Sequence, residues 1–535
     1  MTIKRVILGV LTVVALIPVL FNLIGSVNQP QVQANLQLYQ TNLILQASEL
    51  SLDAFPNSSS TAGAEVGGWR AAILGNEPYK LAQNQYEEAK KLAEKNLSKL
   101  EDKLNILSEN QPEITVENKI NLSKLLSNNT EKNELKQKIN QEKKSIAALE
   151  LKLGLIQAKR GEIQEAKEIW QRLASGVSPE LTKDKIATTA AILKQLWSQP
   201  STISKTVEPT LKTNLQGWFR YAALRQLYET THQQEALANL EKQEQAIATQ
   251  AASKLALISG IPILAGIIGL GLLIFLLIQL LINPKKALLT ITDAQAWETP
   301  WGGETIWQVL IVGFVFFGQI LLPLVFSLGF GLLEINPSSF SLRAKAIYVF
   351  LSYIIMALGG FSVLYLSIRP YFPIPKDWFR FRWLSNWIVW GLGGYLVAIP
   401  LVVIVSLINQ KIWQGEGGSN PLLMLALESQ DTVALIIFFV TAAIAAPLFE
   451  EVMFRGFLLP SLTRYIPVWA AIGVSGLIFA VAHLNVSEVM PLATLGIILG
   501  VVYTRSRNLL SSMLLHSLWN SGTLLSLFLL GSGAG

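Results

Sequence analysis

Long apolar segments constrain this chain more than any other feature, because a membrane accepts only helices and closed barrels that pair their own backbone groups. After Ala252 such segments follow one another to the C-terminal end of the sequence. About 20 apolar residues cross a bilayer as one helix, and most of these segments approach that length. The sequence therefore predicts an all-α bundle with about eight C-terminal membrane spans. We place them at residues 255–282, 306–333, 347–367, 387–408, 433–459, 468–484, 490–503 and 510–530.

An apolar run at residues 6–27 predicts an uncleaved N-terminal signal anchor. Lys4 and Arg5 precede it, and no convincing small-residue cleavage site follows. Because basic flanks stay in the cytoplasm, the anchor sends the next segment to the extracytoplasmic side. We therefore expect an integral multi-pass membrane protein with a cytoplasmic N-terminus. The expected parts are the anchor at residues 1–27, a soluble helical domain at 28–254, a first group of spans at 255–432 and a core at 433–530.

The basic residues between the spans test this topology independently. Lys and Arg gather in cytoplasmic loops, and here they fall in alternate loops of the predicted bundle. They are Lys285, Lys286, Arg369, Lys376, Arg380, Arg382, Arg464, Arg505 and Arg507, with Arg343 and Lys345 as exceptions. We expect the loop around 414–431 on the opposite side, together with the soluble domain.

The soluble segment is dense in Lys and Glu, although charged residues make up only 15% of the chain. Apolar residues at spacings of three and four from Tyr86 onward predict a helical hairpin or a short coiled coil. Two stretches, from Leu153 and from Tyr221, each predict a helix, a polar turn and a second helix. They resemble tetratricopeptide units, and an ordinary helical bundle is the favoured alternative. Either form suits binding of a protein partner or a substrate segment.

Composition excludes several classes of function. Cysteine is absent, which removes disulfides, thiolate metal ligands and a cysteine nucleophile. The net charge of +6 is modest for 535 residues and fits basic cytoplasmic loops, so we expect no nucleic-acid partner. The loop from Arg369 mixes aromatic and basic residues, but between two spans such residues are typical interfacial anchors.

Six polar side chains interrupt the last four spans. A charged group at the centre of a membrane helix costs about 2.5 to 3.5 kcal/mol on insertion scales, so such groups usually face the bundle interior and serve a site. They are Glu450, Glu451, Arg455, His483, His516 and Asn520.

Helical spacing separates the two glutamates. Glu451 and Arg455 stand four residues apart with the acid first, the favourable order for an ion pair on one helical face. Glu450 points about 100° away and has no cation at that spacing. It is therefore free to bind water or to accept a proton, as a general base does.

The last two spans add hydrogen-bonding groups. His516 and Asn520 are also four residues apart, so they share one helical face and offer the paired donors of an oxyanion hole. His483 ends the seventh predicted span, with Phe479 one turn earlier. These boundaries put His483 at a different depth from Glu450, so the seventh span should be offset. Structural roles stay open as well: an ion pair that pins helices, a histidine that caps a helix, and a His/Asn pair that bonds across helices.

In combination these residues resemble the CPBP family, the CAAX-processing and bacteriocin-processing membrane proteases of the Abi type, which are related to the type II CAAX prenyl endopeptidase. The resemblance covers about residues 433–527. Three family motifs occur in order: Glu-Glu-x-x-x-Arg at Glu450, Glu451 and Arg455, Phe-x-x-x-His at Phe479 and His483, and His-x-x-x-Asn at His516 and Asn520.

The resemblance implies an intramembrane endopeptidase without a bound cofactor. Glu450 and His483 would activate a water molecule, and His516 and Asn520 would bind the oxyanion. Glu451 and Arg455 would support the site. A zinc ion stays an alternative, although the His-Glu-x-x-His motif of zinc proteases is absent.

The expected partners are the lipid bilayer and a peptide or protein substrate, prenylated or membrane-anchored. Two other classes of function compete: a non-catalytic membrane scaffold or immunity-type binding protein, and a proton-coupled transporter. The absence of repeat symmetry among the spans argues against transport.

Overall fold

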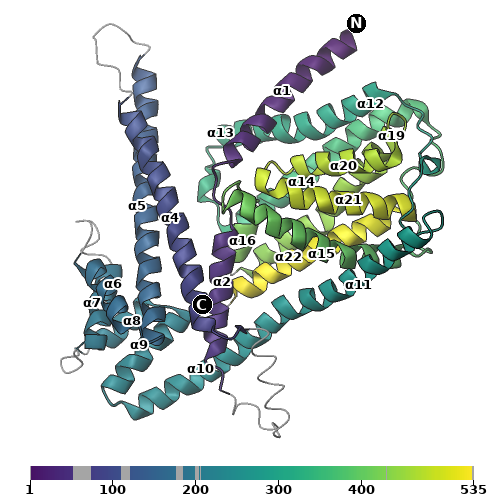
Figure 1. The fold of residues 1–535 in the computed structure, drawn as a ribbon. Helices are drawn as coiled ribbons and strands as arrows, with labels where there is room; N and C mark the ends of the chain where they lie inside the picture. Colours follow the sequence, from purple (N-terminus) through teal and green to yellow (C-terminus); the bar gives the residue numbers. More distant parts are fainter. Residues whose placement is uncertain are drawn as a thin grey trace. The chain divides into compact units, whose positions relative to one another are not determined.

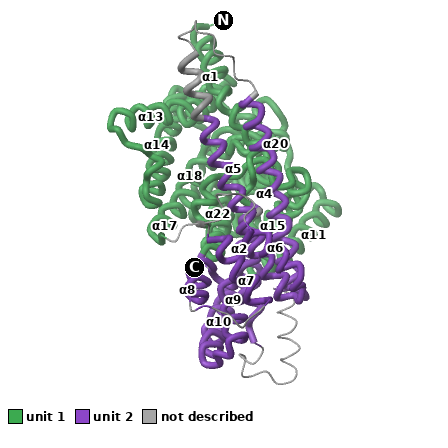
Figure 2. The backbone as a smooth tube through the Cα atoms, turned by 90° about the vertical axis from the view of Figure 1, so that its left-hand side faces the viewer, with its two compact units in different colours: residues 1–32, 260–531 green, residues 33–259, 532–535 purple. Residues whose placement is uncertain are grey.

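The computed structural model describes residues 2–51, 74–109, 121–175, 185–198, 204, 206–428 and 431–532. The chain forms two compact units, coloured separately in Figure 2: unit 1 with residues 1–32 and 260–531, and unit 2 with residues 33–259 and 532–535. In the described residues the secondary structure is helical, apart from one isolated bridge between Pro30 and Glu416. The all-α prediction is confirmed.

Unit 1 is a bundle of long apolar helices (Figure 1). Its helices are α1 (Ile3–Ser26), α11 (Ile261–Ile282), α12 (Gly303–Gln308), α13 (Leu322–Leu332), α14 (Leu342–Ile368), α15 (Trp387–Trp413), α16 (Pro421–Glu428), α17 (Thr432–Val440), α18 (Ala446–Glu451), α19 (Leu459–Leu462), α20 (Val468–Val481), α21 (Val489–Ser506) and α22 (Leu509–Gly531). π-helical segments at Val309–Leu321, Thr441–Ala445 and Val452–Leu458 join α12 to α13, α17 to α18 and α18 to α19.

Eight helices of the described residues are long and apolar enough to cross a membrane, which confirms the multi-pass bundle. The segment predicted as a span at 468–484 differs. It forms α20, a helix of 14 residues and therefore about 21 Å long, short of the roughly 30 Å hydrocarbon core. The helix stops because the chain turns at Leu484, whose φ is +63°.

Glycine allows α20 and α21 to pack closely. A Cβ atom on Gly496 of α21 would lie 2.8 Å from the Cα of Gly476 on α20, too close for any side chain. Small residues at such crossings let two membrane helices approach until their backbones touch. This crossing fixes the position of α20, and with it the position of the turn that follows.

The predicted cytoplasmic loops meet at one end of unit 1. Arg464 Nη1 donates to the Trp301 carbonyl at 2.6 Å, and Arg505 Nη1 donates to the Thr290 carbonyl at 2.8 Å. Lys4 Nζ, in the first turn of α1, pairs with a Glu304 carboxylate oxygen at 3.0 Å. That these loops face the cytoplasm stays a prediction.

Two details of the loops differ from simple expectation. The aromatic residues of the loop from Arg369 do not all lie at the surface: Trp378 is buried and its ring centroid lies 4.3 Å from that of Trp301. Arg343, an exception to the charge pattern, pairs with Asp431 at 2.5 Å. The charge of this exposed side chain is therefore balanced by an ion pair.

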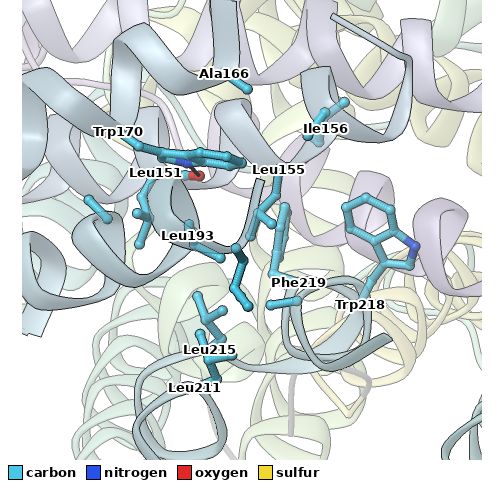
Figure 3. Close-up of a cluster of buried hydrophobic side chains, with 14 of the residues drawn as sticks. Leu151, Leu155, Ile156, Ala166, Trp170, Leu193, Leu211, Leu215, Trp218 and Phe219 are labelled. Atoms are coloured by element: carbon cyan, nitrogen blue, oxygen red, sulfur yellow. Dashed lines mark hydrogen bonds between the residues drawn. The ribbon is translucent and has the colours of Figure 1, made fainter. Parts of the chain in front are cut away.

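Unit 2 consists of α2 (Gln33–Ser48), α4 (Pro78–Glu109), α5 (Asn121–Lys159), α6 (Ile163–Ala174), α7 (Lys185–Ser198), α8 (Val207–Asn214), α9 (Gly217–Thr230) and α10 (Gln234–Leu255). The long helices α4 and α5 pack along each other. Figure 3 shows its apolar core, in which Trp170 and Trp218 are fully buried and the Trp170 indole N–H points to the Leu151 carbonyl. Because this unit has its own core, it is a domain in the physical sense.

A buried carboxylate organises one side of unit 2. Glu49, after α2, accepts hydrogen bonds from the Tyr79 hydroxyl at 2.7 Å and the Trp218 indole at 2.9 Å, and Lys159 Nζ lies 3.0 Å away. Burial alone would raise the pKa of the Glu49 carboxyl, but Lys159 and these hydrogen bonds together lower it below its ordinary value. Glu49 is therefore ionised, and its contacts with Tyr79, Lys159 and Trp218 connect α4, α5 and α9.

Candidate active site

The helix that carries Glu450 changes its winding on both sides of this residue. π-helical turns at Thr441–Ala445 and Val452–Leu458 enclose α18. Such turns are rare and frequently mark functional sites. Pro447 accounts for one irregularity, because it has no N–H and leaves a carbonyl one turn earlier without its helical partner.

Side chains of α22 satisfy the carbonyls before Pro447. Asn520 Nδ2 donates to the Ala442 carbonyl at 2.7 Å, and the Ser517 hydroxyl donates to the Ala443 carbonyl. Asn520 thus bonds across helices, one of the structural roles left open by the sequence, and its amide nitrogen carries a second N–H. Both bonds hold α22 against the helix of Glu450.

Glu451 binds two partners in the bundle interior. Arg455 Nη1 lies 2.8 Å from Glu451 Oε1, and both side chains are fully buried. His516 Nδ1, from α22, lies 2.9 Å from the same oxygen. Arg455 Nη2 also donates to the Gly496 carbonyl on α21 at 2.9 Å. The expected ion pair is present, and it extends to the histidine of the third motif.

Glu450 lies beside this cluster with its two oxygens in different surroundings. Oε1 accepts a hydrogen bond from the Tyr353 hydroxyl of α14 at 3.0 Å. Oε2 is buried without a hydrogen-bond partner among the described residues and lies 3.9 Å from His516 Nε2. A buried carboxylate oxygen without a partner is costly, and it marks the place where a bound water or substrate group gains most.

The ring of Phe479 connects His483 to the same cluster. It lies edge-on to the His483 ring at 5.0 Å and to the His516 ring at 5.6 Å, and the Arg455 guanidinium is 4.5 Å from its centroid. Because α20 is short, His483 follows its last turn and is only half-buried. The Phe479 ring therefore separates two imidazoles that belong to one region of the bundle.

The turn that holds His483 is tied to other parts of unit 1. Asn485 Nδ2 donates to the His483 carbonyl at 3.1 Å, and the Ser26 hydroxyl at the end of α1 accepts from Val486 N–H at 3.1 Å. Ser487 Oγ donates to the Gly418 carbonyl at 2.6 Å. The end of α1 and the loop after α15 thus support this turn.

Hydrogen bonding assigns the protons of the two histidines. A carboxylate or carbonyl oxygen only accepts, so Nδ1 of His516, bonded to Glu451, and Nδ1 of His483, bonded to the Phe479 carbonyl at 2.9 Å, both carry hydrogen. Each ring therefore presents Nε2 away from its support. Around His516 two carboxylates face one guanidinium, so a proton on its Nε2 would make the cluster electrically neutral.

Four of the six predicted residues contact one another directly: Glu450, Glu451, Arg455 and His516. His483 contacts this group through the Phe479 ring, and Asn520 is hydrogen-bonded to the helix that carries Glu450. Sequence reasoning missed Tyr353, because a tyrosine in an apolar span is usually an interfacial residue. The described residues contain no group of three or more His, Cys, Asp or Glu side chains arranged to hold a metal ion.

The fold and these contacts define a class: an α-helical multi-pass membrane protein with carboxylates, imidazoles and a guanidinium gathered inside the bundle. Residues 432–522, which include all six predicted residues, match the family described as type II CAAX prenyl endopeptidase Rce1-like. Over these residues the chain is similar to the Rce1-like CAAX proteases, and the resemblance inferred from its motifs is confirmed.

One relative is the membrane-embedded CAAX protease MroQ of Staphylococcus aureus (strain USA300). It is 24% identical over 224 residues, which cover 40% of this chain and 87% of that protein. No solved structure matches the chain.

Proposed function

We propose that this protein is an intramembrane endopeptidase that hydrolyses a peptide bond with water activated by Glu450. The observation that supports this most is the buried Glu450 Oε2, which has no partner among the described residues and lies 3.9 Å from His516 Nε2. The oxygen atom of a water molecule between Glu450 Oε2 and His516 Nε2 can lie within ordinary hydrogen-bond distance of both atoms. A scaffold has no use for such an arrangement.

In the proposed reaction the water oxygen attacks the scissile carbonyl carbon and its proton passes to Glu450. The intermediate collapses with cleavage of the C–N bond, and Glu450 returns the proton to the leaving amine. His483, whose ring packs on Phe479, is assigned the role of assisting this proton transfer.

The developing oxyanion is stabilised by two groups on α22. His516, held at Nδ1 by Glu451, donates from Nε2, and Asn520 donates its second amide N–H. Glu451 and Arg455 do not take part in bond making. They fix the His516 ring and balance its charge.

The proposed substrate is a membrane-anchored peptide or a prenylated C-terminal peptide. The match to the CAAX prenyl endopeptidase family and the apolar surroundings of the site support this class. The proposed chemistry needs no metal ion, because a carboxylate base and paired donors suffice for water attack on an amide.

The test replaces Glu450 by Gln, which keeps the shape of the side chain and removes its basicity. Membrane-anchored peptides are compared by proteomics between cells with the wild-type protein and cells with Glu450→Gln, using Glu334→Gln at an exposed turn as the control. Peptides should accumulate uncleaved only with Glu450→Gln. If both variants match the wild type, and the purified protein cleaves nothing that Glu450→Gln spares, the scaffold function is correct.

A further inference from the structure

The proposed mechanism leaves open what directs Glu450 to use one oxygen rather than the other. Tyr353 lies on α14, outside the family match at 432–522, yet its hydroxyl contacts Glu450 Oε1 at 3.0 Å. It therefore reaches the site from a preceding span. A phenol hydroxyl within this distance donates its proton to a carboxylate in a charge-assisted hydrogen bond.

We propose that Tyr353 is a positioning residue for the peptidase reaction: its hydroxyl occupies Glu450 Oε1, fixes the carboxylate plane and leaves Oε2 as the oxygen that activates water. This inference rests on the proposed function.

Packing supports a fixed phenol. The Tyr353 ring stands edge-on to Phe449 with ring centroids 6.2 Å apart, and Phe449 in turn lies edge-on to Phe361 at 5.2 Å. Phe449 is fully buried against Gly360, where a Cβ atom would lie 2.8 Å from the Phe449 ring. Phe449 precedes Glu450 in the chain, so the aromatic contact places the phenol and the carboxylate as one unit.

The consequence for chemistry lies in the orientation of the Glu450 carboxylate. Without the Tyr353 hydroxyl, Glu450 would rotate more freely, so fewer molecules would hold Oε2 next to His516. Binding of substrate would be unaffected, because the hydroxyl is already bonded to Glu450.

The first test is kinetic. Tyr353→Phe keeps the ring and removes the hydroxyl; the matched control is Tyr348→Phe on the same helix, whose ring packs on Phe326 and Phe340. With a fluorogenic farnesylated CAAX peptide in proteoliposomes, we expect Tyr353→Phe to lower kcat about tenfold with KM within about twofold. Tyr348→Phe should match the wild type.

The second test needs no turnover. 3-Fluorotyrosine at position 353 of the purified full chain should give a 19F signal whose chemical shift changes in Glu450→Gln, because the hydroxyl contacts that carboxylate, and stays the same in Glu334→Gln. A 19F signal that does not change in Glu450→Gln, or a Tyr353→Phe protein with the wild-type kcat, overturns the inference.

The two proposals can fail separately. If Glu450→Gln cleaves the peptide as the wild type does, the proposed function fails. If Glu450→Gln is inactive while Tyr353→Phe is normal, only the role of Tyr353 fails. If the wild type leaves the farnesylated peptide intact, the prenyl substrate class fails and the 19F measurement alone decides on Tyr353.

Discussion

His516 Nδ1 lies 2.9 Å from Glu451 Oε1, so the histidine of the last span and the second glutamate of the first motif form one hydrogen-bonded pair inside the bundle. This pair determines which histidine nitrogen faces Glu450. Arg455 Nη1 lies 2.8 Å from the same Glu451 oxygen.

Replacement of Arg455 tests how the cluster of Glu451, Arg455 and His516 affects the stability of the protein. Arg455→Met leaves the Glu451 carboxylate buried without its cation, and we expect a loss of about 3 to 5 kcal/mol of stability. The double variant Glu451→Leu/Arg455→Met removes both charges and should be more stable than the single variant, although it loses the support of His516 and therefore activity. Thermal unfolding in detergent measures both. A single variant that is as stable as the double variant would contradict the account.

Gly496→Ala tests the crossing of α20 and α21. The added methyl group would meet Gly476 at 2.8 Å and lie 3.3 Å from Arg455 Nη2. We expect a loss of about 1 to 3 kcal/mol from overpacking, together with reduced activity. Gly473→Ala is the matched control, because a Cβ atom there meets nothing within 4 Å. Equal stability of the two variants would show that the helices do not cross as described.

Gly417→Ala tests the support of the His483 turn. Gly417 has φ +101°, and a Cβ atom there would lie 2.6 Å from the Ser487 Cβ. A side chain would therefore be strained and would displace the segment that follows His483. We expect faster hydrogen exchange over residues 483–489 and a loss of activity of about tenfold or more. Gly331→Ala, which has open space around it, should change neither property.

The pH dependence of unit 2 should follow Glu49. Its folded pKa lies below the ordinary value of 4.5, so its ionised form contributes stability above that value, and the contribution is lost as the pH falls through the folded pKa. Hydrogen exchange in α9 should therefore accelerate below about pH 4.5, after correction for the intrinsic rate. Glu49→Gln should be less protected at pH 7 and should lack this acid step. An identical pH dependence in both proteins would exclude Glu49 as the cause.

A chelator separates the proposed water activation from the zinc alternative. Purified protein treated with a strong zinc chelator should retain its peptidase activity, because the proposed proton transfers involve side chains only. Added zinc should not increase it. Loss of activity on chelation, restored by zinc, would instead support the metal mechanism.

Sequence patterns predicted most of the bundle because membrane spans depend on length and hydrophobicity, which are read directly from the chain. The i, i+4 spacing likewise predicted the pair of Glu451 with Arg455. The limit of α20 could not be predicted this way, since Val468 to Ala482 is apolar apart from Ser475 and only the turn at Leu484 ends the helix.

Contacts between distant segments were not predictable from spacing. Nothing in the sequence around Tyr353 links it to Glu450, 97 residues later. Helical spacing placed His516 and Asn520 on one face, but it could not show that Asn520 bonds to the Ala442 carbonyl, because that bond depends on the irregular winding before Pro447. Trp378 was expected at the membrane interface and is buried because a tryptophan from another loop, Trp301, packs against it.

The central claim is that Glu450 activates the water that cleaves the peptide bond, and single-turnover cleavage tests it most directly. Wild-type protein and Glu450→Gln, both shown to be folded by thermal unfolding, are mixed in excess with a farnesylated CAAX peptide in proteoliposomes. The account predicts that Glu450→Gln lowers the cleavage rate by about 10³-fold or more. Cleavage by Glu450→Gln at the wild-type rate would contradict it.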